Sequence, residues 1–346
     1  FKRMKNLLSI QKISILIIAS ILLVSSCSKK VQNFSLAFYN VENLFDTIDD
    51  PTIQDERFLP DSELDWNTAK YDHKLNNIAK VIRAIDTSGF PSTIGLAEVE
   101  NIMVLEDLVS HPYIAEAGYK FFHQEGNDER GIDVALLYIP EKYKPVKTEY
   151  INLYFPFDPS VGVRDILYSK GIINSKDTVH IFINHWKSRW GGQEESEPFR
   201  RYTAQLLKRY TDSIFNMIPD ANIIIAGDLN DNPDDISIAE DLLAVEPTEP
   251  YLDQKLYNLS IKQYKIGEGT LYYKSWDMFD QIIVSTSILN GENGLKANSR
   301  DQQIIKKDWM LYFPKRGEPR PNRTAARDYY GGYSDHLPIY IKLSTQ

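Results

Sequence analysis

Residues Tyr333 to Pro338, "YSDHLP", place an acid beside a histidine directly before the strand-like run "IYIKL". Such a pair can be part of a surface turn. It can also be one end of an active site, because α/β enzymes assemble their sites where strands end and loops begin. Other strand ends in the chain decide between the two readings.

Short runs rich in Val, Ile, Tyr and Phe recur along the chain and predict strands. They are "SLAFYN" from Ser35, "TIGLAEV" from Thr93, "VALLYI" from Val134, "VHIFINHW" from Val179, "NIIIAGDLN" from Asn222, "QIIVST" from Gln281 and "PIYIKL" from Pro338. Apolar residues at three- and four-residue spacing predict helices over 68–86, 197–216 and 236–245. This mixture predicts α/β layers, with sheet inside and helices outside.

Several predicted strands end in polar side chains that strands do not favour. Each one alone is explained by a turn, a cap or a satisfied, partly buried histidine. A carboxylate within an apolar run, such as Glu98, needs a cation or several donors nearby. Because the polar residues recur at six strand ends, we expect one convergent site built from Asn40, Glu42, Glu98, Asn184, His185, Asp228, Asn230, Asp280, Asp335 and His336.

The first 27 residues have the pattern of a secretory signal: a basic start without acids, the apolar run "ISILIIASILLV", then "SSC". Residues 24–27, "VSSC", resemble a bacterial lipobox, in which Cys27 becomes the lipidated first residue. An uncleaved membrane anchor is the alternative, but the apolar run is shorter than the ~20 residues of a membrane span. We expect a signal peptide over 1–27, a tether over 28–34 and one domain over 35–346, exported and lipid-anchored to the bacterial envelope, at the periplasmic side or the cell surface.

Composition limits the classes of partner. Of the 346 residues 42% are apolar, which suffices for a large core, and Cys27 is the only cysteine, so no disulfide framework is available. Residues 1–27 contain four basic and no acidic residues, so their removal takes the formal net charge from −9 to −13. The net negative charge of the chain does not attract nucleic acid over long distances, although a local strip of basic residues is still a possible binding surface.

Seven blocks in order resemble the endonuclease/exonuclease/phosphatase superfamily, in particular its deoxyribonuclease-like members. They are "FYNVENLFD" (38–46), "GLAEVEN" (95–101), "RGIDVALLY" (130–138), "NHWKSRWGG" (184–192), "IIAGDLNDNP" (224–233), "FDQIIVS" (279–285) and "GGYSDHLPIY" (331–340). The resemblance implies a four-layer α/β/β/α sandwich, two packed mixed β-sheets flanked by helices, with the site at one edge.

The resemblance also implies a metal site. Glu98 matches the principal ligand of a catalytic divalent ion, usually Mg²⁺, with Asn40 and Asp335 close to it. Many relatives have Asp two residues after the position of Asn40, where this chain has Glu42, which we also expect near the metal. Mg²⁺ prefers oxygen ligands, which suits this set, and Mn²⁺ is a possible substitute. The chain has no cysteine- or histidine-rich zinc cage.

Two histidines match catalytic positions of the family. His336 paired with Asp280 is expected to contact a phosphoryl oxygen or to take a proton, since an acidic partner fixes the imidazole tautomer and supports its cation. His185 matches a histidine that resembles a general acid in the deoxyribonuclease branch. Asp133 is our candidate for its acidic partner. Which histidine acts as acid is left open.

The remaining matches concern the phosphate. Asp228 and Asn230 are expected to orient the attacking water and the phosphate, and Arg164 and Lys187 to bind the substrate. Residues 306–333 interleave basic and aromatic side chains, which suits contact with single-stranded nucleic acid or a phosphorylated head group, or a solvated loop.

Together these features predict a metal-dependent phosphoesterase that cleaves phosphodiester bonds, most simply as a monomeric, nuclease-like hydrolase of nucleic acid or its fragments. The membrane is the second expected partner, through the lipidated N-terminus. A phosphomonoesterase or a sphingomyelinase-like phospholipid hydrolase is the enzymatic alternative. A non-catalytic surface lipoprotein that binds through the same scaffold is the alternative of another class.

Overall fold

The computed structural model describes residues 33–345, and the statements below concern this part of the chain. The predicted signal peptide, Cys27 and residues 28–32 of the predicted tether lie outside it. Strand β1 already begins at Phe34, the last residue assigned to the tether. None of the helices within residues 33–345 combines the length and the apolar character that crossing a membrane requires.

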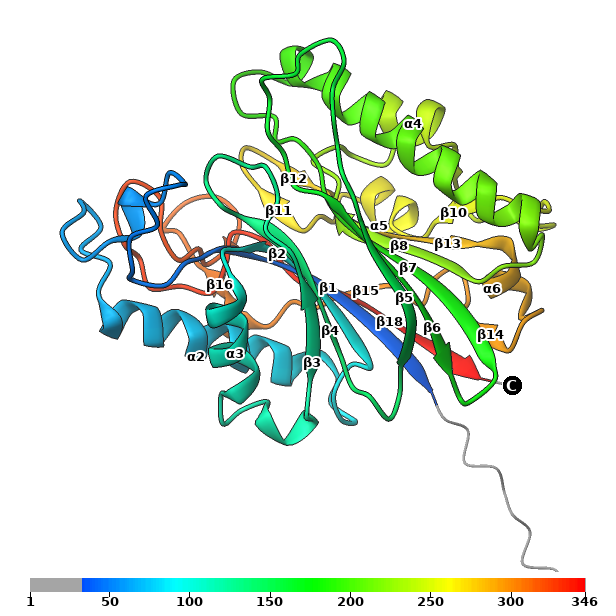
Figure 1. Ribbon diagram of the computed structural model, residues 1–346, viewed down its shortest axis with the longest axis horizontal. Helices are drawn as coiled ribbons and strands as arrows, with labels where there is room; N and C mark the ends of the chain where they lie inside the picture. The colour runs from blue at the N-terminus through cyan, green and yellow to red at the C-terminus, as the bar shows by residue number, and fades with distance from the viewer. Residues whose placement is uncertain (1–32, 346) are drawn as a thin grey trace, which may run out of the picture. The chain divides into compact units, whose positions relative to one another are not determined.

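Within residues 33–345, one of two seven-stranded sheets has the order β14-β18-β1-β2-β4-β3, with β15 also paired to β18 (Figure 1). Strands β1 and β2 run parallel, and the other neighbours run antiparallel, so the sheet is mixed. The strands are β1 (Phe34–Leu44), β2 (Thr93–Val99), β3 (Lys120–His123), β4 (Asp133–Tyr138), β14 (Leu295–Lys296), β15 (Gln303–Ile304) and β18 (Ile339–Thr345).

The other seven-stranded sheet of the described chain has the order β5-β6-β7-β8-β13-β10-β9. Here β7 and β8 run parallel, as do β10 and β9. Its strands are β5 (Lys144–Ile151), β6 (Ile166–Ile173), β7 (Asp177–His185), β8 (Ile223–Asp228), β9 (Ala244–Val245), β10 (Leu256–Asn258) and β13 (Asp280–Ser285).

Two short hairpins and several helices complete the described residues. The hairpins join β11 (Leu271–Tyr272) to β12 (Trp276–Asp277) and β16 (Leu311–Tyr312) to β17 (Arg320–Pro321). The α-helices are α2 (Thr68–Ile85), α3 (Ile102–Ser110), α4 (Gln193–Met217), α5 (Ile261–Lys265) and α6 (Thr286–Asn290). Shorter helical turns span Glu56–Phe58, Ala115–Ala117, Ser237–Asp241 and Asp308–Met310.

The two sheets pack face to face because successive residues of a strand point to opposite sides. In β1, Phe38 enters a buried cluster that also contains Ile183 of the second sheet, whereas Tyr39 enters a cluster with the helices α2 and α3. Apolar residues on both faces of both sheets therefore require a helical layer on each outer side. The predicted four-layer α/β/β/α sandwich is confirmed (Figure 1).

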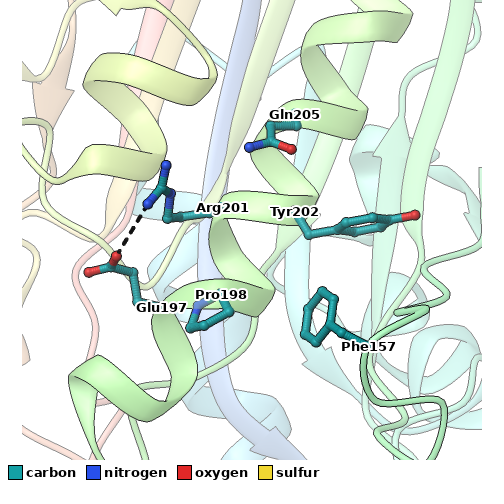
Figure 2. A pocket seen from close by; sticks show the side chains of 6 residues that line it. All are labelled: Phe157, Glu197, Pro198, Arg201, Tyr202 and Gln205. Carbon is teal, nitrogen blue, oxygen red and sulfur yellow. Dashed lines mark ion pairs between the residues drawn. The ribbon is translucent and has the colours of Figure 1, made fainter.

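Helix α4 covers the outer face of the second sheet. Its buried residues Leu207 and Phe215 pack against Phe182 and Ile225. Near its start, α4 meets the loop that carries Phe157, whose ring lies 5.9 Å from that of Tyr202 (Figure 2).

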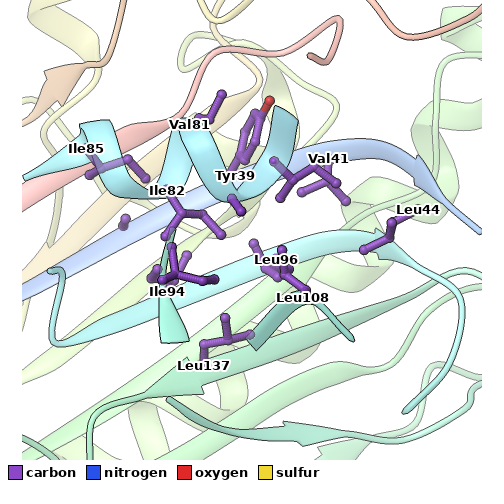
Figure 3. Packing of buried hydrophobic residues seen from close by; sticks show 14 of the residues in the cluster. Tyr39, Val41, Leu44, Val81, Ile82, Ile85, Ile94, Leu96, Leu108 and Leu137 are labelled. Carbon is purple, nitrogen blue, oxygen red and sulfur yellow. The ribbon is translucent and has the colours of Figure 1, made fainter. Parts of the chain in front are cut away.

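Helix α2 covers the outer face of the first sheet. Ile82 and Ile85 lie over Tyr39 and Leu96, as the predicted apolar spacing requires (Figure 3). Asn67 caps the helix, since its side chain accepts a hydrogen bond from the backbone N–H of Lys70.

Parts of the fold differ from the prediction, which included neither α3 nor β3. Over 236–245 the chain forms only the turn Ser237–Asp241 and then β9, because Leu243 takes a left-handed conformation, with φ of 58°, that ends the helical path. Strands β5 and β6 were not predicted. Strand β5 is an edge strand, "KPVKTEYI", and its exposed polar residues hide the apolar signal.

Candidate active site

Six predicted site residues lie at one edge of the sandwich because of strand direction. Parallel strands end at the same edge, so Asn40 of β1 and Glu98 of β2 are neighbours, as are His185 of β7 and Asp228 of β8. Antiparallel strands start where their partners end. Consequently Asp280 pairs with Asp228 in register, and His336 leads into β18 beside β1.

Glu98 owes its position to a β-bulge. Leu96 and Val99 both face the α2 layer, and Ala97 faces the other sheet, so Glu98 is an extra residue in the alternation. Its φ of 64° is left-handed, which strains a residue with a Cβ and re-aims the side chain. The carboxylate accepts hydrogen bonds from the backbone N–H of Asn43 (2.9 Å) and from Nδ2 of Asn40 (3.2 Å), and the side chain stays 16% exposed.

Asn40 joins the two sheets through its amide. Nδ2 donates to Oδ2 of Asp228 at 2.9 Å as well as to Glu98, and Oδ1 accepts the backbone N–H of Glu42 at 3.0 Å. The amide thus holds two carboxylates together as a donor. The resemblance places Asn40 close to the metal, and here its oxygen faces the backbone.

His336 and Asp280 form the expected pair, with Nδ1 and Oδ2 2.6 Å apart. Nε2 of the same ring lies 3.7 Å from Oδ2 of Asp228. Burial disfavours the imidazolium, but Asp280 and Asp228 outweigh it and hold the pKa of His336 well above its usual value. Among the described residues, Oδ1 of Asp280 has no hydrogen-bond partner.

His185 is buried and in the opposite electrostatic state. Its Nε2 lies 3.6 Å from Oδ2 of Asp228 and 3.9 Å from Oε1 of Glu98. Burial, followed by the charges of Arg164 and Arg130, holds the pKa of His185 well below its usual value, so the ring is neutral.

The predicted partner of His185 makes no contact with it. The carboxylate of Asp133 accepts the backbone N–H of Gly126 at 2.9 Å, and no described residue partners Nδ1 of His185. The pairing of Asp133 with His185 was therefore wrong. No sequence motif fixed that partner, and the structure supplies Asp228 on the other ring nitrogen.

Asp228 depends on the glycine before it. A Cβ at Gly227 would lie 2.4 Å from the carbonyl oxygen of Asn184 on the neighbouring strand, so no larger residue fits. The close approach keeps His185 and Asp228 in register. Burial raises the pKa of Asp228 to about 6, and the nearby His336 limits the rise.

Asn230 lies beside the catalytic edge in a left-handed turn, with φ of 50°. Its backbone N–H donates to Oδ1 of Asp228 at 3.0 Å, and its Nδ2 donates to the carbonyl of Trp186 at 3.0 Å. It therefore orients Asp228 and fixes the loop that follows His185.

The two predicted substrate cations differ in their freedom. Arg164 is only 1% exposed, and its guanidinium donates to Asp128 at 2.8 Å and to the carbonyl of Trp186. Arg164 therefore holds Asp128 and the backbone at Trp186 together inside the protein, which differs from the predicted contact with substrate. Lys187 is half-buried, its ammonium group has no hydrogen-bond or ion-pair partner among the described residues, and burial lowers its pKa.

Glu42 is committed to the loop before the "SDH" motif. One carboxylate oxygen accepts Nε of Arg323 at 3.0 Å, and the other accepts the backbone N–H of Thr324 at 2.6 Å. Arg323 also reaches Asp335, at 3.1 Å. The arrangement favours a bracing role for Glu42 over the predicted metal ligation. Burial and Asp335 raise its pKa to about 7.

Sequence reasoning missed Lys74 and Arg323. Lys74 is 1% exposed and donates to the hydroxyl of Thr324 and, at 3.0 Å, to the carbonyl of Tyr333. A lysine four residues before Ile78 on the apolar face of a predicted helix is the signal that was available. Arg323 lay within the basic and aromatic segment without a distinguishing motif.

The residues present suit a hard divalent cation. Asp228, Asp280 and His336 offer ligand atoms within 4.8 Å of one another. The imidazole of this group is already paired with Asp280, whereas Glu98 is partly exposed and each of its oxygens accepts only one hydrogen bond. Carboxylate oxygens crowded at one edge suit Mg²⁺ or Mn²⁺ better than a soft metal.

Two pockets are lined by residues other than the His336–Asp280 pair. One, of about 260 Å³, lies between α4 and Phe157 and contains no predicted site residue (Figure 2). Figure 2 shows Glu197 and Arg201 paired at its rim, 3.8 Å apart. The other, of about 320 Å³, is lined by acidic residues that include Glu100, Asp128 and Asp133. We place the chemistry by the contacts of Glu98, Asp228 and His336, since concavity alone does not supply reactive groups.

Solved structures resemble the fold. Danio rerio TDP2 complexed with single-strand DNA product matches with a TM-score of 0.56 and 16% identity over 91% of this chain and 100% of that one. The human Nocturnin catalytic domain matches with a TM-score of 0.54 and 15% identity over 91% and 95%. A mannosyl-6-phosphatase of Bacteroides thetaiotaomicron matches with a TM-score of 0.53 and 17% identity over 90% and 99%.

No curated protein sequence matches the chain. The model of the Endonuclease/Exonuclease/phosphatase family, in contrast, matches residues 35–345, which is nearly all of the described chain. Enzymes of this family hydrolyse phosphoesters, and the site above has the acids and histidines for that chemistry. The chain belongs to the endonuclease/exonuclease/phosphatase family.

Proposed function

We propose that the protein is a divalent-metal-dependent phosphodiesterase of the nuclease type. The observation that carries this proposal is the His336–Asp280 pair facing Asp228, with His185 near the same oxygen of Asp228 and also near Glu98. Two histidines in opposite charge states beside an oxygen-rich site suit acid–base chemistry, and a pure binding scaffold has no need of them.

The chain's own residues can carry the proton steps. Asp228, ionised at neutral pH because its pKa is about 6, accepts a hydrogen bond from the attacking water and aims it at phosphorus. Asn230 holds that carboxylate in place through its backbone N–H. The imidazolium of His336, supported by Asp280, donates to a non-bridging oxygen as charge develops there.

His185 is the neutral partner in this scheme. Its low pKa leaves the ring able to hydrogen-bond the leaving oxygen or the water without carrying a permanent charge. Glu98 and Asp335 would hold the Mg²⁺ or Mn²⁺ ion, with the amide of Asn40 close by. Such an ion supplies Lewis-acid stabilisation of negative charge on the phosphate.

Substrate class and location complete the proposal. A protein solved with single-strand DNA product and a mannosyl-6-phosphatase both have this fold, which supports either nucleic acid or a phosphorylated small molecule as the substrate class. We favour nucleic acid fragments as substrate because basic and aromatic residues interleave over 306–333.

We further propose that the chain is exported, monomeric and anchored through a lipid on Cys27. Loss of labelled palmitate from a Cys27→Ser variant and light scattering of the soluble chain test these points.

The deciding experiment is hydrolysis by the chain from Ser28 onward with Mg²⁺, Mn²⁺ or EDTA. The substrates are single- and double-stranded DNA, RNA, bis-p-nitrophenyl phosphate, p-nitrophenyl phosphate and sphingomyelin. We expect metal-dependent cleavage of diesters that His336→Ala abolishes while the circular dichroism spectrum stays native. Faster cleavage of the monoester or of sphingomyelin would move the protein to the alternative branch. A folded chain that cleaves none of them would refute the phosphodiesterase proposal, and a titration of Mg²⁺ would then separate a narrow-substrate phosphatase from a binding scaffold.

A further inference from the structure

Few cations at the catalytic edge are free to meet a substrate phosphate. Arg164 is buried and donates to Asp128 and Trp186. Arg189, in the loop after His185, is bound to Asp231 and to the backbone of Asn230. Arg323 differs, because 42% of its side chain is exposed while it touches Asp335, the residue next to His336. Its surroundings therefore decide whether it can bind an anion.

The guanidinium of Arg323 is held along one side only. Nε donates to Oε1 of Glu42 at 3.0 Å and to the carbonyl of Ala325 at 2.9 Å, and Nη2 donates to Oδ2 of Asp335 at 3.1 Å. A guanidinium has five N–H donors. Within residues 33–345, no hydrogen bond from Nη1 is found, so both of its N–H groups and one on Nη2 are left over.

Arg323 carries one positive charge and contacts two carboxylates, those of Glu42 and Asp335. Without a second cation, this cluster would have a net negative charge. Lys74 supplies the second positive charge: it is buried, donates to Thr324 and Tyr333, and interacts electrostatically with both Glu42 and Asp335. Lys74 and Arg323 together match Glu42 and Asp335 in charge. The cluster therefore carries no excess negative charge that would repel an incoming anion from the remaining N–H groups of Arg323.

The segment that carries Arg323 is fixed to the first sheet and to α2. Nδ2 of Asn77 donates to the carbonyl of Gly332 at 2.8 Å, and Oγ of Ser334 donates to the carbonyl of Asn40 at 2.8 Å. An arginine fork held on a braced loop loses little rotamer freedom when it binds.

We propose that Arg323 is a substrate-binding residue, whose remaining N–H groups donate to a non-bridging oxygen of the substrate phosphate. The proposal deepens the proposed function and rests on it. Arg323 takes the substrate-binding role that the sequence suggested for Arg164. A planar fork with two adjacent donors matches two oxygens of one phosphate, which a lysine does not.

The test is a calorimetric titration of inorganic phosphate into the chain from Ser28 onward in buffer with Mg²⁺. Arg323→Gln should weaken phosphate binding by about tenfold or more, the loss expected for a charge-assisted bidentate contact. Arg323→Lys should recover only part of the affinity. Arg327→Gln is the matched control, since Arg327 is exposed on the same loop and has no hydrogen bond or ion pair among the described residues.

A separate titration of Mg²⁺ into each variant removes the structural alternative. We expect Arg323→Gln to lower the melting temperature, because buried Glu42 loses an ion-pair partner, but not to weaken the binding of Mg²⁺. The proposal is overturned by absent phosphate binding in the parent chain, by unchanged binding in Arg323→Gln, by an equal loss in Arg327→Gln, or by a loss that follows Mg²⁺ affinity. Because binding is measured without turnover, a parent chain that binds phosphate but hydrolyses nothing refutes the proposed function and leaves Arg323 as an anion site.

Discussion

The imidazole of His336 and the carboxylate of Asp280 lie 2.6 Å apart although they belong to different sheets. Asp280 starts β13 of the second sheet, and His336 leads into β18 of the first. The same holds for Asn40 and Asp228, which are 2.9 Å apart. The site therefore exists only when the two sheets are packed, and each half alone carries an incomplete set of groups.

Asp280→Asn should lower the pKa of His336, because the charge that supports the imidazolium is removed while the shape of the side chain is kept. We expect hydrolysis at neutral pH to fall by about 10²- to 10⁴-fold. An NMR titration of the His336 ring checks the pKa, and Asp253→Asn at an exposed position is the control. An unshifted His336 in the variant would show that Asp280 does not set its charge.

The same pair predicts a pH dependence of stability. The pKa of His336 is raised in the folded chain, so the stabilisation is fully present below the unfolded pKa of about 6.5 and is lost as pH rises through the folded pKa. In Asp280→Asn the loss of stability relative to the parent should therefore be larger at pH 6 than at high pH. Urea unfolding at a series of pH values measures it, and an equal loss at all pH values would contradict the assignment.

Glu98→Gln should weaken the binding of Mg²⁺ more than it disturbs the fold. The carboxylate is partly exposed and held by two donors, and glutamine keeps an oxygen for one of them while losing the charge. We expect the Mg²⁺ concentration for half-maximal activity to rise at least about tenfold, the scale of 1.4 kcal/mol. Glu106→Gln, on the exposed face of α3, is the control. Unchanged Mg²⁺ dependence would remove Glu98 from the metal site.

Glu100→Gln should stabilise the metal-free chain at alkaline pH. Burial raises the pKa of Glu100 from 4.5 to about 8, so the folded chain binds a proton that the unfolded chain releases. This group therefore lowers the free energy of unfolding progressively as pH rises from about 4.5 to 8. We expect the variant to gain about 1 to 3 kcal/mol at pH 8.5 and almost nothing at pH 4.5, measured by urea unfolding in EDTA. A gain of equal size at both pH values would contradict the titration of Glu100.

Lys74→Met should destabilise the chain strongly, because it leaves Glu42 buried beside Asp335 with one cation fewer. Lys74 acts on Glu42 through its charge, and leaving a buried charge uncompensated costs up to about 3 to 5 kcal/mol. The double variant Lys74→Met/Glu42→Gln should recover part of this loss, which urea unfolding measures as a coupling energy. Lys70→Met removes an ion pair with the exposed Asp65 and should cost less than about 1 kcal/mol. Additive losses in the double variant would show that Lys74 and Glu42 are independent.

Most of the central fold was predictable because buried strands have a strong local signal. The runs that start at Ser35, Thr93 and Asn222 are apolar on both faces, as expected of strands packed between a sheet and a helix. The edge strand β5 lacked this signal. The helix predicted over 236–245 is shortened to the single π-helical turn Ser237–Asp241, because Leu243 takes a left-handed conformation that its residue type does not predict.

The site was predictable in its membership and less so in its contacts. Asp228, Asp280 and His336 stand beside strands, so strand order alone brings them together. The partners of Glu42 and Arg164 depend on side-chain packing between distant segments, which no local pattern encodes. Arg164 contacts Asp128 and the carbonyl of Trp186, which lie 36 and 22 positions away along the chain.

The close approach of Gly227 to the backbone of Asn184 makes a residue without a side chain necessary for the geometry of the site. Any side chain there must displace the neighbouring backbone at Asn184, and with it the spacing between His185 and Asp228. In a mutational scan that measures activity, substitutions of Gly227 would therefore cause losses similar to those of Asp228. Only a measurement of strand geometry would distinguish a direct role of Asp228 in the reaction from the steric requirement for glycine at position 227.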